Sequence, residues 1–330
     1  MSADERLRRG VVVIGRNEGE RLKACLASIQ GAPDEIVYVD SGSDDGSVQW
    51  ARSQGIDVVE LDLATHFTAA RARNAGFRRL ISRRPDVALV QFVDGDCQLA
   101  PGWFSAAESF LSRHADVAVV CGRRRERFPD ASIFNAQCDR EWNTPVGEAR
   151  ACGGDAMYRR MAFEACGGFR DSLIAGEEPE LCLRLRAAGW RVWRIDQEMT
   201  AHDAALLHWR QWWRRTLRTG HAFAEGAWLH GSTPEHHWVA ETRRAAAWGL
   251  VLPLLGVLAA AFLGPWFLLI FLLYPLQVVR LACRSAAGSR EEFQQAALLV
   301  LGRFPEGLGV ARFWYGKLFD RESGLIEYKM

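Results

Sequence analysis

The sequence predicts an α/β fold, with a mostly parallel β-sheet flanked by helices and then a C-terminal hydrophobic helical hairpin. Three observations lead to this prediction. Short apolar runs alternate with segments of helical periodicity over residues 1–204, as in β-α-β units. The stretch 245–279 contains no charged side chain and is interrupted at Gly264-Pro265. The chain of 330 residues is long enough for one large domain and an appended part.

The predicted strands are short apolar runs, and the predicted helices have apolar residues three or four positions apart. The expected strands are residues 11–14, 35–39, 58–61, 87–93 and 190–195. The expected helices are residues 20–29, 48–54, 69–82, 160–166 and 179–188. Pro179 suits the first position of the last of these helices, and Gly189 suits its end.

The composition changes after residue 204, which divides the chain into four parts. Residues 1–204 carry the α/β pattern, 205–244 an amphipathic helix and linker, 245–284 the hairpin, and 285–330 a C-terminal amphipathic helix and tail. The helix of the second part is rich in Trp and Arg, as is typical of membrane interfaces, although an ordinary packed helix has the same pattern. One face of this helix is expected to carry Leu206, Trp209, Trp213, Leu217 and Gly220.

Arginines flank the hydrophobic hairpin on both sides, at Arg243, Arg244, Arg280 and Arg284. The positive-inside rule then places both ends in the cytoplasm. A full crossing takes roughly 20 residues, so the charge-free stretch is short for two crossings. Two short transmembrane helices and a re-entrant wedge therefore both remain open, as does a buried hairpin in a soluble protein. We expect attachment to a lipid bilayer, at the cytoplasmic (inner) membrane.

The overall charge excludes one class of partner. Lys and Arg number 41 and Asp and Glu number 40, so bulk electrostatics gives no reason to expect binding to nucleic acid. The N-terminus has no apolar core of signal-peptide length, which favours a cytoplasmic location for residues 1–204. The eight cysteines form no Cys-x-x-Cys pair and lie in apolar stretches, so we expect buried free thiols in a reducing compartment and no zinc site.

Acidic residues follow two of the predicted parallel strands. Asp40 follows the second strand, and the motif Asp94-Gly95-Asp96 follows the fourth. Ligands of open α/β sheets bind at the carboxyl ends of the strands. Carboxylate oxygens are the ligands that Mg²⁺ or Mn²⁺ accepts, although a turn after a strand often has this composition as well.

Five motifs in a fixed order give the Asp-Gly-Asp motif a context. The motifs are VVIGRNE (12–18), VDSGSDDGS (39–47), ARNAG (72–76), FVDGD (92–96) and GEEPEL (176–181). In these motifs the sequence resembles the inverting glycosyltransferases of family 2, which have the GT-A fold, and the resemblance covers residues 11–202. It implies a membrane-attached enzyme that moves a hexosyl or N-acetylhexosaminyl group from a nucleotide-diphospho-sugar donor to a lipid-linked or glycan acceptor.

The resemblance implies donor-binding roles for several residues. Glu18 and Asp40 would line the nucleoside pocket, and Arg73 would reach the diphosphate, with Arg71 as a second candidate. Asn74 would hold the donor or the neighbouring loop. The family often has a second Asp directly after the first at the second strand. This chain has Ser there instead, which leaves the base of the nucleotide open.

The same resemblance assigns a metal, Mn²⁺ or Mg²⁺. Asp96 would be the direct ligand, while Asp94 and Gly95 would face the ribose or act through water. His202, after the last predicted strand, would complete the metal sphere, and its imidazole would suit Mn²⁺ better than Mg²⁺.

The acidic pair Glu177-Glu178 occupies the family's Glu-Asp position, whose second acid is the general base. Glu178 is therefore the expected base, with Glu177 as the alternative, on a loop before a helix. A helix-capping acid would have the same sequence pattern. Gly154 and Asp155 would shape the acceptor side, where Asp155 would bind acceptor hydroxyls.

Other functions fit the sequence less well. A dehydrogenase or a nucleotidyltransferase would need a glycine-rich loop after the first strand that this chain lacks. A retaining hydrolase pair would not need the nucleotide-site residues. Two alternatives stay open: a membrane-anchored, catalytically decayed transferase-like binding protein, and a processive polysaccharide synthase.

Overall fold

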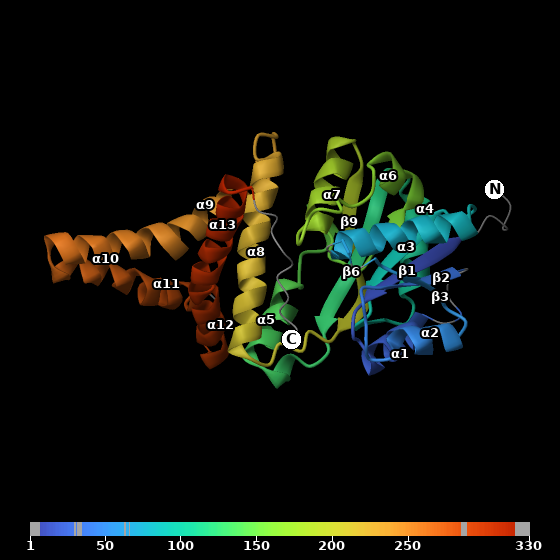
Figure 1. Ribbon diagram of the computed structural model, residues 1–330, viewed down its shortest axis with the longest axis horizontal. Coiled ribbons are helices and arrows are strands. Elements are labelled where there is room, and N and C mark those ends of the chain that lie inside the picture. The colour runs from blue at the N-terminus through green and yellow to red at the C-terminus, as the bar shows by residue number, and fades with distance from the viewer. Residues whose placement is uncertain are drawn as a thin grey trace. The chain divides into compact units, whose positions relative to one another are not determined.

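The computed structural model describes residues 7–29, 31, 35–62, 64, 65, 67–284 and 289–320. The chain divides into two compact units (Figure 1). The first comprises residues 1–129 and 138–205, and the second comprises residues 130–137 and 206–330. Each unit has its own architecture and is described by itself.

The first unit is built on a nine-stranded sheet in the order β3-β2-β1-β4-β8-β6-β9-β5, with β7 paired to β9. Its strands are β1 (Arg9–Gly15), β2 (Glu35–Asp40), β3 (Asp57–Glu60), β4 (Leu89–Asp94), β5 (Cys97–Leu99), β6 (Val117–Glu126), β7 (Gly147–Glu148), β8 (Ala156–Arg159) and β9 (Arg191–His202). The helices are α1 (Glu20–Ile29), α2 (Ser47–Ser53), α3 (Ala69–Arg83), α4 (Trp103–Arg113), α6 (Arg160–Ala165) and α7 (Glu177–Ala187). Most of the short η1 (Pro129–Ala131) and the first half of α5 (Ile133–Glu141) belong to the second unit, and α5 ends in the first.

The parallel half of this sheet confirms the predicted β-α-β pattern. Strands β3, β2, β1 and β4 pair in parallel. Helix α3 lies so close to β1 and β2 that a Cβ added at Gly76 would come within 2.3 Å of Val12 and 2.8 Å of Val39. The other half is mixed: β6 and β9 pair in parallel, whereas β8 runs antiparallel to both β4 and β6, and β9 runs antiparallel to β5 and β7.

The pairs of the mixed half bring further residues to the carboxyl edge of the parallel strands. The first residue of β8, Ala156, pairs with Phe92 near the end of β4. The last residue of β9, His202, pairs with Cys97 at the start of β5 and with Glu126 at the end of β6. Residues from four different strands therefore meet beside the Asp-Gly-Asp motif.

Two predicted boundaries near the site are wrong. Helix α7 begins at Glu177, two positions before Pro179, because Gly176 takes a left-handed conformation (φ 83°) and turns the chain into the helix. The two glutamates consequently lie in the first helical turn rather than on a loop. Strand β9 extends to His202 instead of ending at residue 195, because its second half pairs with β6 from Glu198 onward and with β5 from Thr200 to His202.

The second unit is helical. It contains α8 (Trp209–His230), α9 (Val239–Ala246), the π-helical turn η2 (Ala247–Val251), α10 (Leu252–Leu263), η3 (Pro265–Leu272), α11 (Leu273–Ala282), α12 (Arg290–Leu301) and α13 (Arg303–Leu318). Helix α13 packs against α8 through glycines: a Cβ added at Gly220 would lie 2.0 Å from the carbonyl oxygen of Glu306. The buried face of α8 contains Trp212 and Thr216, whereas Trp209 is 46% exposed, so the predicted face was rotated from the real one.

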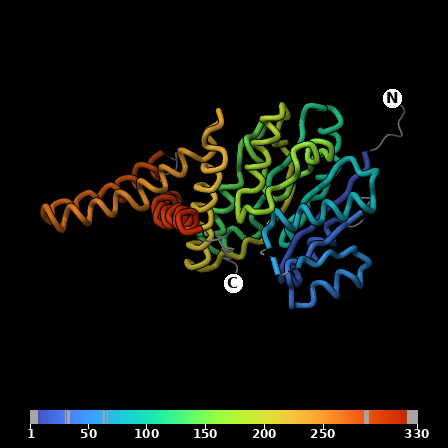
Figure 2. Tube along the Cα trace, turned by 45° about the horizontal axis from the view of Figure 1, so that its top comes forward, coloured from blue at the N-terminus to red at the C-terminus, as the bar shows by residue number. Residues whose placement is uncertain are grey.

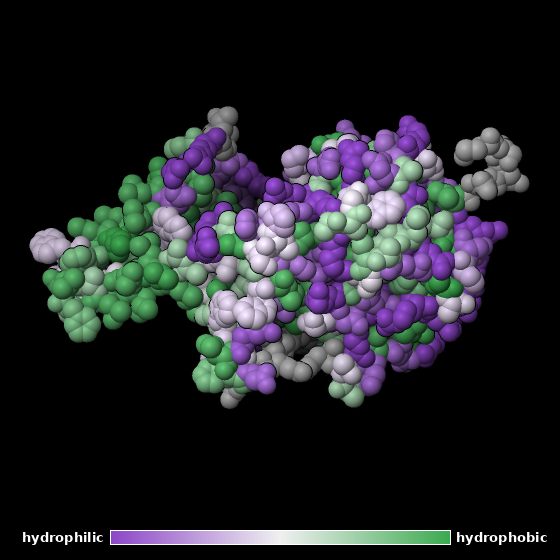
Figure 3. All heavy atoms as spheres, turned by 90° about the horizontal axis from the view of Figure 1, so that it is seen from above, coloured by the Kyte–Doolittle hydropathy of each residue, from purple (hydrophilic) through white to green (hydrophobic). Residues whose placement is uncertain are grey.

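The predicted hairpin is present, and its turn lies at Gly264 as expected. Two continuous helical segments, Val239–Leu263 of 25 residues and Pro265–Ala282 of 18 residues, are long and apolar enough to cross a membrane by length and composition. They run side by side and project from the bundle of α8, α12 and α13 (Figure 2). Apolar side chains gather over this hairpin (Figure 3), and Phe262 and Trp266 are 82% and 79% exposed.

A hydrogen bond between the two arms compensates for an irregularity in the first arm. Pro253 has no backbone N–H, and the helix before it widens into the π-turn η2. Leu252 N–H donates to Ala247, which leaves the Trp248 carbonyl without its usual helical donor. The hydroxyl of Tyr274 donates to that carbonyl at 2.6 Å. The charge-free segment thus keeps this backbone oxygen satisfied, as an apolar environment requires.

Candidate active site

Arg73 on α3 is the centre of a cluster of carboxylates. Its guanidinium is 2% exposed and donates to Asp94 at 2.7 Å and to Glu177 at 2.8 Å, and it lies 3.0 Å from Glu178. These anions raise the already high pKa of Arg73 further, against the effect of burial. The side chain that the resemblance assigns to the diphosphate therefore holds the end of β4 against the start of α7.

Glu178 has an unusual protonation equilibrium. Burial and the neighbouring charge of Glu177 raise its pKa to about 7, while Arg73 opposes the shift. A carboxylate with a pKa near neutrality can both accept and release a proton under physiological conditions. Gly154 makes this arrangement possible, since a Cβ there would lie 2.5 Å from Arg73, 3.0 Å from Asp94 and 3.1 Å from Glu178.

Asp155 lies beneath this cluster and is fully buried. One carboxylate oxygen accepts from the backbone N–H of Asp94 at 3.0 Å, and the other accepts from the Thr200 hydroxyl at 2.9 Å. The prediction that Asp155 binds acceptor hydroxyls is therefore wrong, because its oxygens face the protein interior. It positions Asp94 instead.

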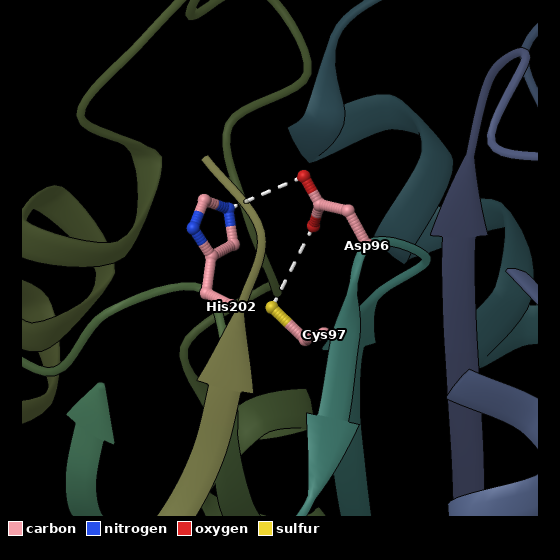
Figure 4. Close-up of side chains that lie close together, drawn as sticks. All are labelled: Asp96, Cys97 and His202. Atoms are coloured by element: carbon pink, nitrogen blue, oxygen red, sulfur yellow. Dashed lines mark hydrogen bonds and ion pairs between the residues drawn. The ribbon is translucent and has the colours of Figure 1, made fainter. Parts of the chain in front are cut away.

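A second cluster lies next to it, around Asp96 (Figure 4). Nε2 of His202 is 3.2 Å from one carboxylate oxygen of Asp96, and Sγ of Cys97 is 3.6 Å from the other. The three side chains each offer one ligand atom, and these atoms lie within 4.8 Å of one another. The predicted pairing of Asp96 with His202 is present, and Cys97 is an addition that the sequence analysis missed.

The donor set of this second cluster fits a divalent cation. Burial and Arg124 lower the pKa of His202, which keeps its imidazole neutral, as a ligand must be. Within the described residues, Nδ1 of His202 is buried without a hydrogen-bond partner, 3.7 Å from Glu126. Metal-ligating histidines usually donate their second N–H to a carboxylate, and Glu126 lies where that partner would be. Burial raises the pKa of Cys97 above its usual range.

Two further residues were missed by sequence reasoning, Arg124 on β6 and Trp142 after α5. The Arg124 guanidinium lies 3.4 Å from both Asp94 and Asp155 and stacks over the Trp142 ring at 4.8 Å from its centre. Trp142 in turn meets His202 edge-on at 4.8 Å. The run of three arginines at 123–125 followed by Glu126 was the available signal, but β6 was not recognised as a strand of the same sheet edge.

The residues predicted for the nucleoside lie at the ends of β1 and β2. Both oxygens of Asp40 are engaged: they accept from the Tyr38 hydroxyl on the same strand, and from the N–H of Gly42 and from Ser43 in the following loop. Glu18 is 9% exposed and pairs with Arg21 at 2.8 Å. Gly95 N–H donates to the Ile14 carbonyl at 2.7 Å, and a Cβ at Gly95 would lie 3.2 Å from Glu18. The structure thus brings Glu18 beside the Asp-Gly-Asp motif.

Arg71 and Asn74 point to loops rather than to the carboxylate cluster. The Arg71 guanidinium donates to the carbonyls of Asp62 and Thr65. The Asn74 amide donates to the Phe169 carbonyl at 2.7 Å and accepts from its N–H at 3.0 Å. Of the two alternatives stated for Asn74, the structure therefore shows the loop-holding contact.

Comparisons with known proteins find similarity to glycosyltransferases. Residues 10–167 match the model of glycosyl transferase family 2. The chain is 24% identical over 214 residues to the O-antigen chain rhamnosyltransferase RfbN of Salmonella typhimurium, a match covering 60% of this chain and 65% of that protein. It is 26% identical over 211 residues to the glycosyltransferase AglE of Haloferax volcanii, covering 60% of this chain and 66% of that protein. These matches span just under two thirds of each relative.

The fold has a solved counterpart. The mannosyltransferase PcManGT from Pyrobaculum calidifontis, in complex with GDP-Man and Mn²⁺, superposes with a TM-score of 0.62 at 20% identity, covering 95% of this chain and 89% of that one. At this identity the likeness shows the GT-A fold. The motifs and the family match thus make the chain similar to glycosyl transferase family 2 over residues 10–167, and the solved counterpart shows that it has the GT-A fold.

Proposed function

We propose that this protein transfers a sugar from a nucleotide-diphospho-sugar donor to an acceptor hydroxyl with inversion of configuration. The observation that carries the proposal is Glu178, a carboxylate of near-neutral pKa held by Arg73 beside Asp94. A general base with these properties suits the deprotonation of a hydroxyl. The proposed site for a divalent cation is the second cluster, in which Nε2 of His202 lies 3.2 Å from a carboxylate oxygen of Asp96.

The proposed reaction is a single displacement. Glu178 accepts the proton of the acceptor hydroxyl while the hydroxyl oxygen forms a bond to the anomeric carbon. The bond between that carbon and the diphosphate oxygen breaks, and the configuration inverts. A bound Mn²⁺ or Mg²⁺, held by Asp96 and His202, would supply electrostatic stabilisation of the departing diphosphate. Arg73 fixes Glu178 and Asp94 relative to each other, so the proposed base keeps a constant position beside the Asp-Gly-Asp motif.

The donor is proposed to be a nucleotide-linked hexose, deoxyhexose or N-acetylhexosamine. A relative named as a rhamnosyltransferase and a structural neighbour bound to GDP-Man support this range. Thermal shift measurements with Mn²⁺ across UDP-, GDP- and dTDP-sugars should give one nucleotide series that stabilises the wild type. The Asp96→Ala variant should lose the Mn²⁺-dependent part of that shift, and an equal shift in both proteins would contradict the metal site.

Glu178 is tested by removing its charge while keeping its shape. Glu178→Gln should keep the donor-induced thermal shift and lose sugar transfer by about 100-fold or more, the usual contribution of a general base. Unchanged transfer would reassign the base to Glu177. A wild type that binds the donor but transfers no sugar to any acceptor would instead favour the decayed, binding-only alternative.

The second unit is proposed to attach the enzyme to the cytoplasmic face of the inner membrane, where a lipid-linked or glycan acceptor would be presented. The segments of 25 and 18 residues are long and apolar enough to cross a membrane by length and composition, and their charge-free parts are 245–263 and 265–279. The exposed Cys283, after the second arm, gives a direct test. A membrane-impermeant maleimide should label it in inverted vesicles but not in intact spheroplasts; the reverse pattern would contradict the orientation. In a Cys283→Ser background, Gly264→Cys should be labelled in spheroplasts if the hairpin crosses, and labelling only from the cytoplasmic side would show a wedge.

A further inference from the structure

We propose that Cys97 is a ligand of the divalent cation, and that its sulfur makes the site select Mn²⁺, Co²⁺ or Zn²⁺ over Mg²⁺. The inference rests on the metal-dependent transfer proposed above and goes beyond it, because it assigns a thiol to the metal and predicts which cations the site accepts. It is argued from the position of Cys97 between two groups of acidic residues and from the way Arg124 occupies one of them.

Cys97 belongs to two candidate ligand groups at once. The first contains Asp96 and His202, and the second contains Asp94 and Asp155. In each group the possible ligand atoms lie within 4.8 Å of one another. The thiol is fully buried, and Asp96 and His202 are each 5% exposed, so a cation placed among the first group would be largely removed from water.

Arg124 distinguishes the two groups. Its guanidinium lies 3.4 Å from Asp94 and 3.4 Å from Asp155, and Nη2 is 3.6 Å from the sulfur of Cys97. A positive charge therefore already balances the second group, and the Trp142 ring stacked against the guanidinium fixes it there. The first group instead joins an imidazole to a carboxylate and the thiol, and we place the divalent cation there because these three side chains each offer a ligand atom.

Figure 4 shows that Cys97 and His202 approach the Asp96 carboxylate from two neighbouring strands. The strand register explains this, since Cys97 begins β5 and pairs directly with His202 at the end of β9. One carboxylate, one imidazole and one thiol thus converge from rigid sheet positions. Glu126, 3.7 Å from Nδ1 of His202, adds the outer partner that orients a metal-bound imidazole.

The chemistry of this donor set argues against Mg²⁺. Mg²⁺ prefers oxygen ligands in a nearly ideal octahedron, whereas imidazole and thiolate suit softer divalent ions. When the metal–sulfur bond forms, the thiol proton is released to the solvent, and neither the metal nor the sulfur changes oxidation state. The expected result is a cation preference set by a single sulfur atom.

Co²⁺ is a suitable probe, because a sulfur ligand adds a near-ultraviolet charge-transfer absorption that oxygen and nitrogen ligands do not give. The full-length protein is freed of metal with a chelator and titrated with Co²⁺, while the bound Co²⁺ is measured separately by ultrafiltration. The wild type should show this absorption in proportion to the bound Co²⁺. Cys97→Ser should bind Co²⁺ at least about tenfold more weakly and without the absorption, since loss of an outer partner alone costs about that much. Cys121→Ser, another buried thiol but outside both groups, is the matched control and should behave as the wild type.

Competition with Mg²⁺ gives the selectivity. Mg²⁺ should displace Co²⁺ from Cys97→Ser at a concentration at least about tenfold lower than from the wild type. Cys97→Ala serves as a second variant. The unfolding midpoint of each variant is measured, and only variants whose midpoint equals that of the wild type are compared. Bound Co²⁺ without the sulfur absorption in the wild type would overturn the role of Cys97 and leave metal-dependent transfer in place. Absence of any Co²⁺ binding, together with turnover in chelator, would overturn both.

Discussion

The electrostatic coupling between Glu177 and Glu178 predicts how the reaction rate depends on pH. The neighbouring charge of Glu177 is, after burial, the largest cause that raises the pKa of Glu178 from 4.5 to about 7. Glu177→Gln removes that charge and keeps the shape of the side chain. It also frees the Arg73 nitrogen that now lies 2.8 Å from Glu177 and 3.0 Å from Glu178. Both changes favour the ionised form of Glu178, so its pKa should fall.

The magnitude follows from the size of the present shift. A rise from 4.5 to about 7 corresponds to roughly 3 kcal/mol against the ionised form of Glu178 in the folded protein. Removal of a like charge typically moves a carboxyl pKa by on the order of one unit or more. Since burial is the first cause of the shift and remains in the variant, the pKa of Glu178 should fall by about one unit without returning to its ordinary value.

The assay is the pH profile of kcat/KM for sugar transfer, which reports ionisations of the free enzyme. In the wild type the rate should rise with pH through about 7, as Glu178 loses its proton, and then level off. Glu177→Gln should show the same rise about one unit lower. Glu164→Gln, on the exposed side of α6, is the matched control and should leave the profile unchanged. A rise that stays at the same pH in Glu177→Gln, or moves to higher pH, would refute the electrostatic coupling of the two acids.

The same shift has a consequence for stability. A group whose folded pKa is raised stabilises the protein below its unfolded pKa, and this stability is lost as the pH rises through the folded value. For Glu178 the loss therefore falls between about pH 4.5 and about pH 7. Glu178→Gln, which mimics the protonated form, should be more stable than the wild type at pH 8, by up to roughly 3 kcal/mol, and equal to it near pH 4. Urea unfolding at both pH values measures the difference.

Three further predictions concern packing and charge. Arg73→Met should lower the free energy of unfolding by about 3–5 kcal/mol in urea titrations, since it leaves buried carboxylates without their cation; a loss below 1 kcal/mol would contradict the central role of the guanidinium. Gly220→Ala should reduce the thermal stability of the second unit by about 1–3 kcal/mol, because the new methyl would meet the Glu306 carbonyl, whereas Thr219→Ala on the same helix should not. Tyr274→Phe should cost about 1 kcal/mol in detergent, since a backbone carbonyl of the first hairpin arm loses its donor, and unchanged unfolding would show that another donor replaces it.

Much of the fold could be predicted because its local signals are strong. The helix 20–29 and the strand ending at Asp40 occur where the apolar spacing placed them, and the hairpin turn lies at Gly264. The start of α7 was misplaced because proline usually occupies the first helical position, while here the left-handed Gly176 starts the helix earlier. Strand β6 was missed because its second half is charged, and that half is stabilised by pairing with β9, which is a tertiary effect.

The sequence predicted which residues belong to the candidate site better than it predicted which residues they contact. Asp96 and His202 are 3.2 Å apart although 106 positions separate them, as the family motifs led us to expect. The partners of Arg73 could not be foreseen, since nothing in the sequence tells whether a buried arginine will meet a phosphate or the protein's own carboxylates. Arg124 was overlooked for the related reason that its strand was not identified.

Gly154 has a consequence for how relatives of this enzyme can diverge. Its main chain touches the positions of Arg73, Asp94 and Glu178 so closely that even one methyl group would displace a charged side chain. The wall facing the carboxylates is therefore made of backbone, and its shape does not depend on the choice of a side chain. At exposed positions, such as residues 143–146 after Trp142, substitutions are expected to leave this wall unchanged. The spacing of the three charged groups is therefore set by the main chain at Gly154 and is independent of side chains elsewhere on the surface.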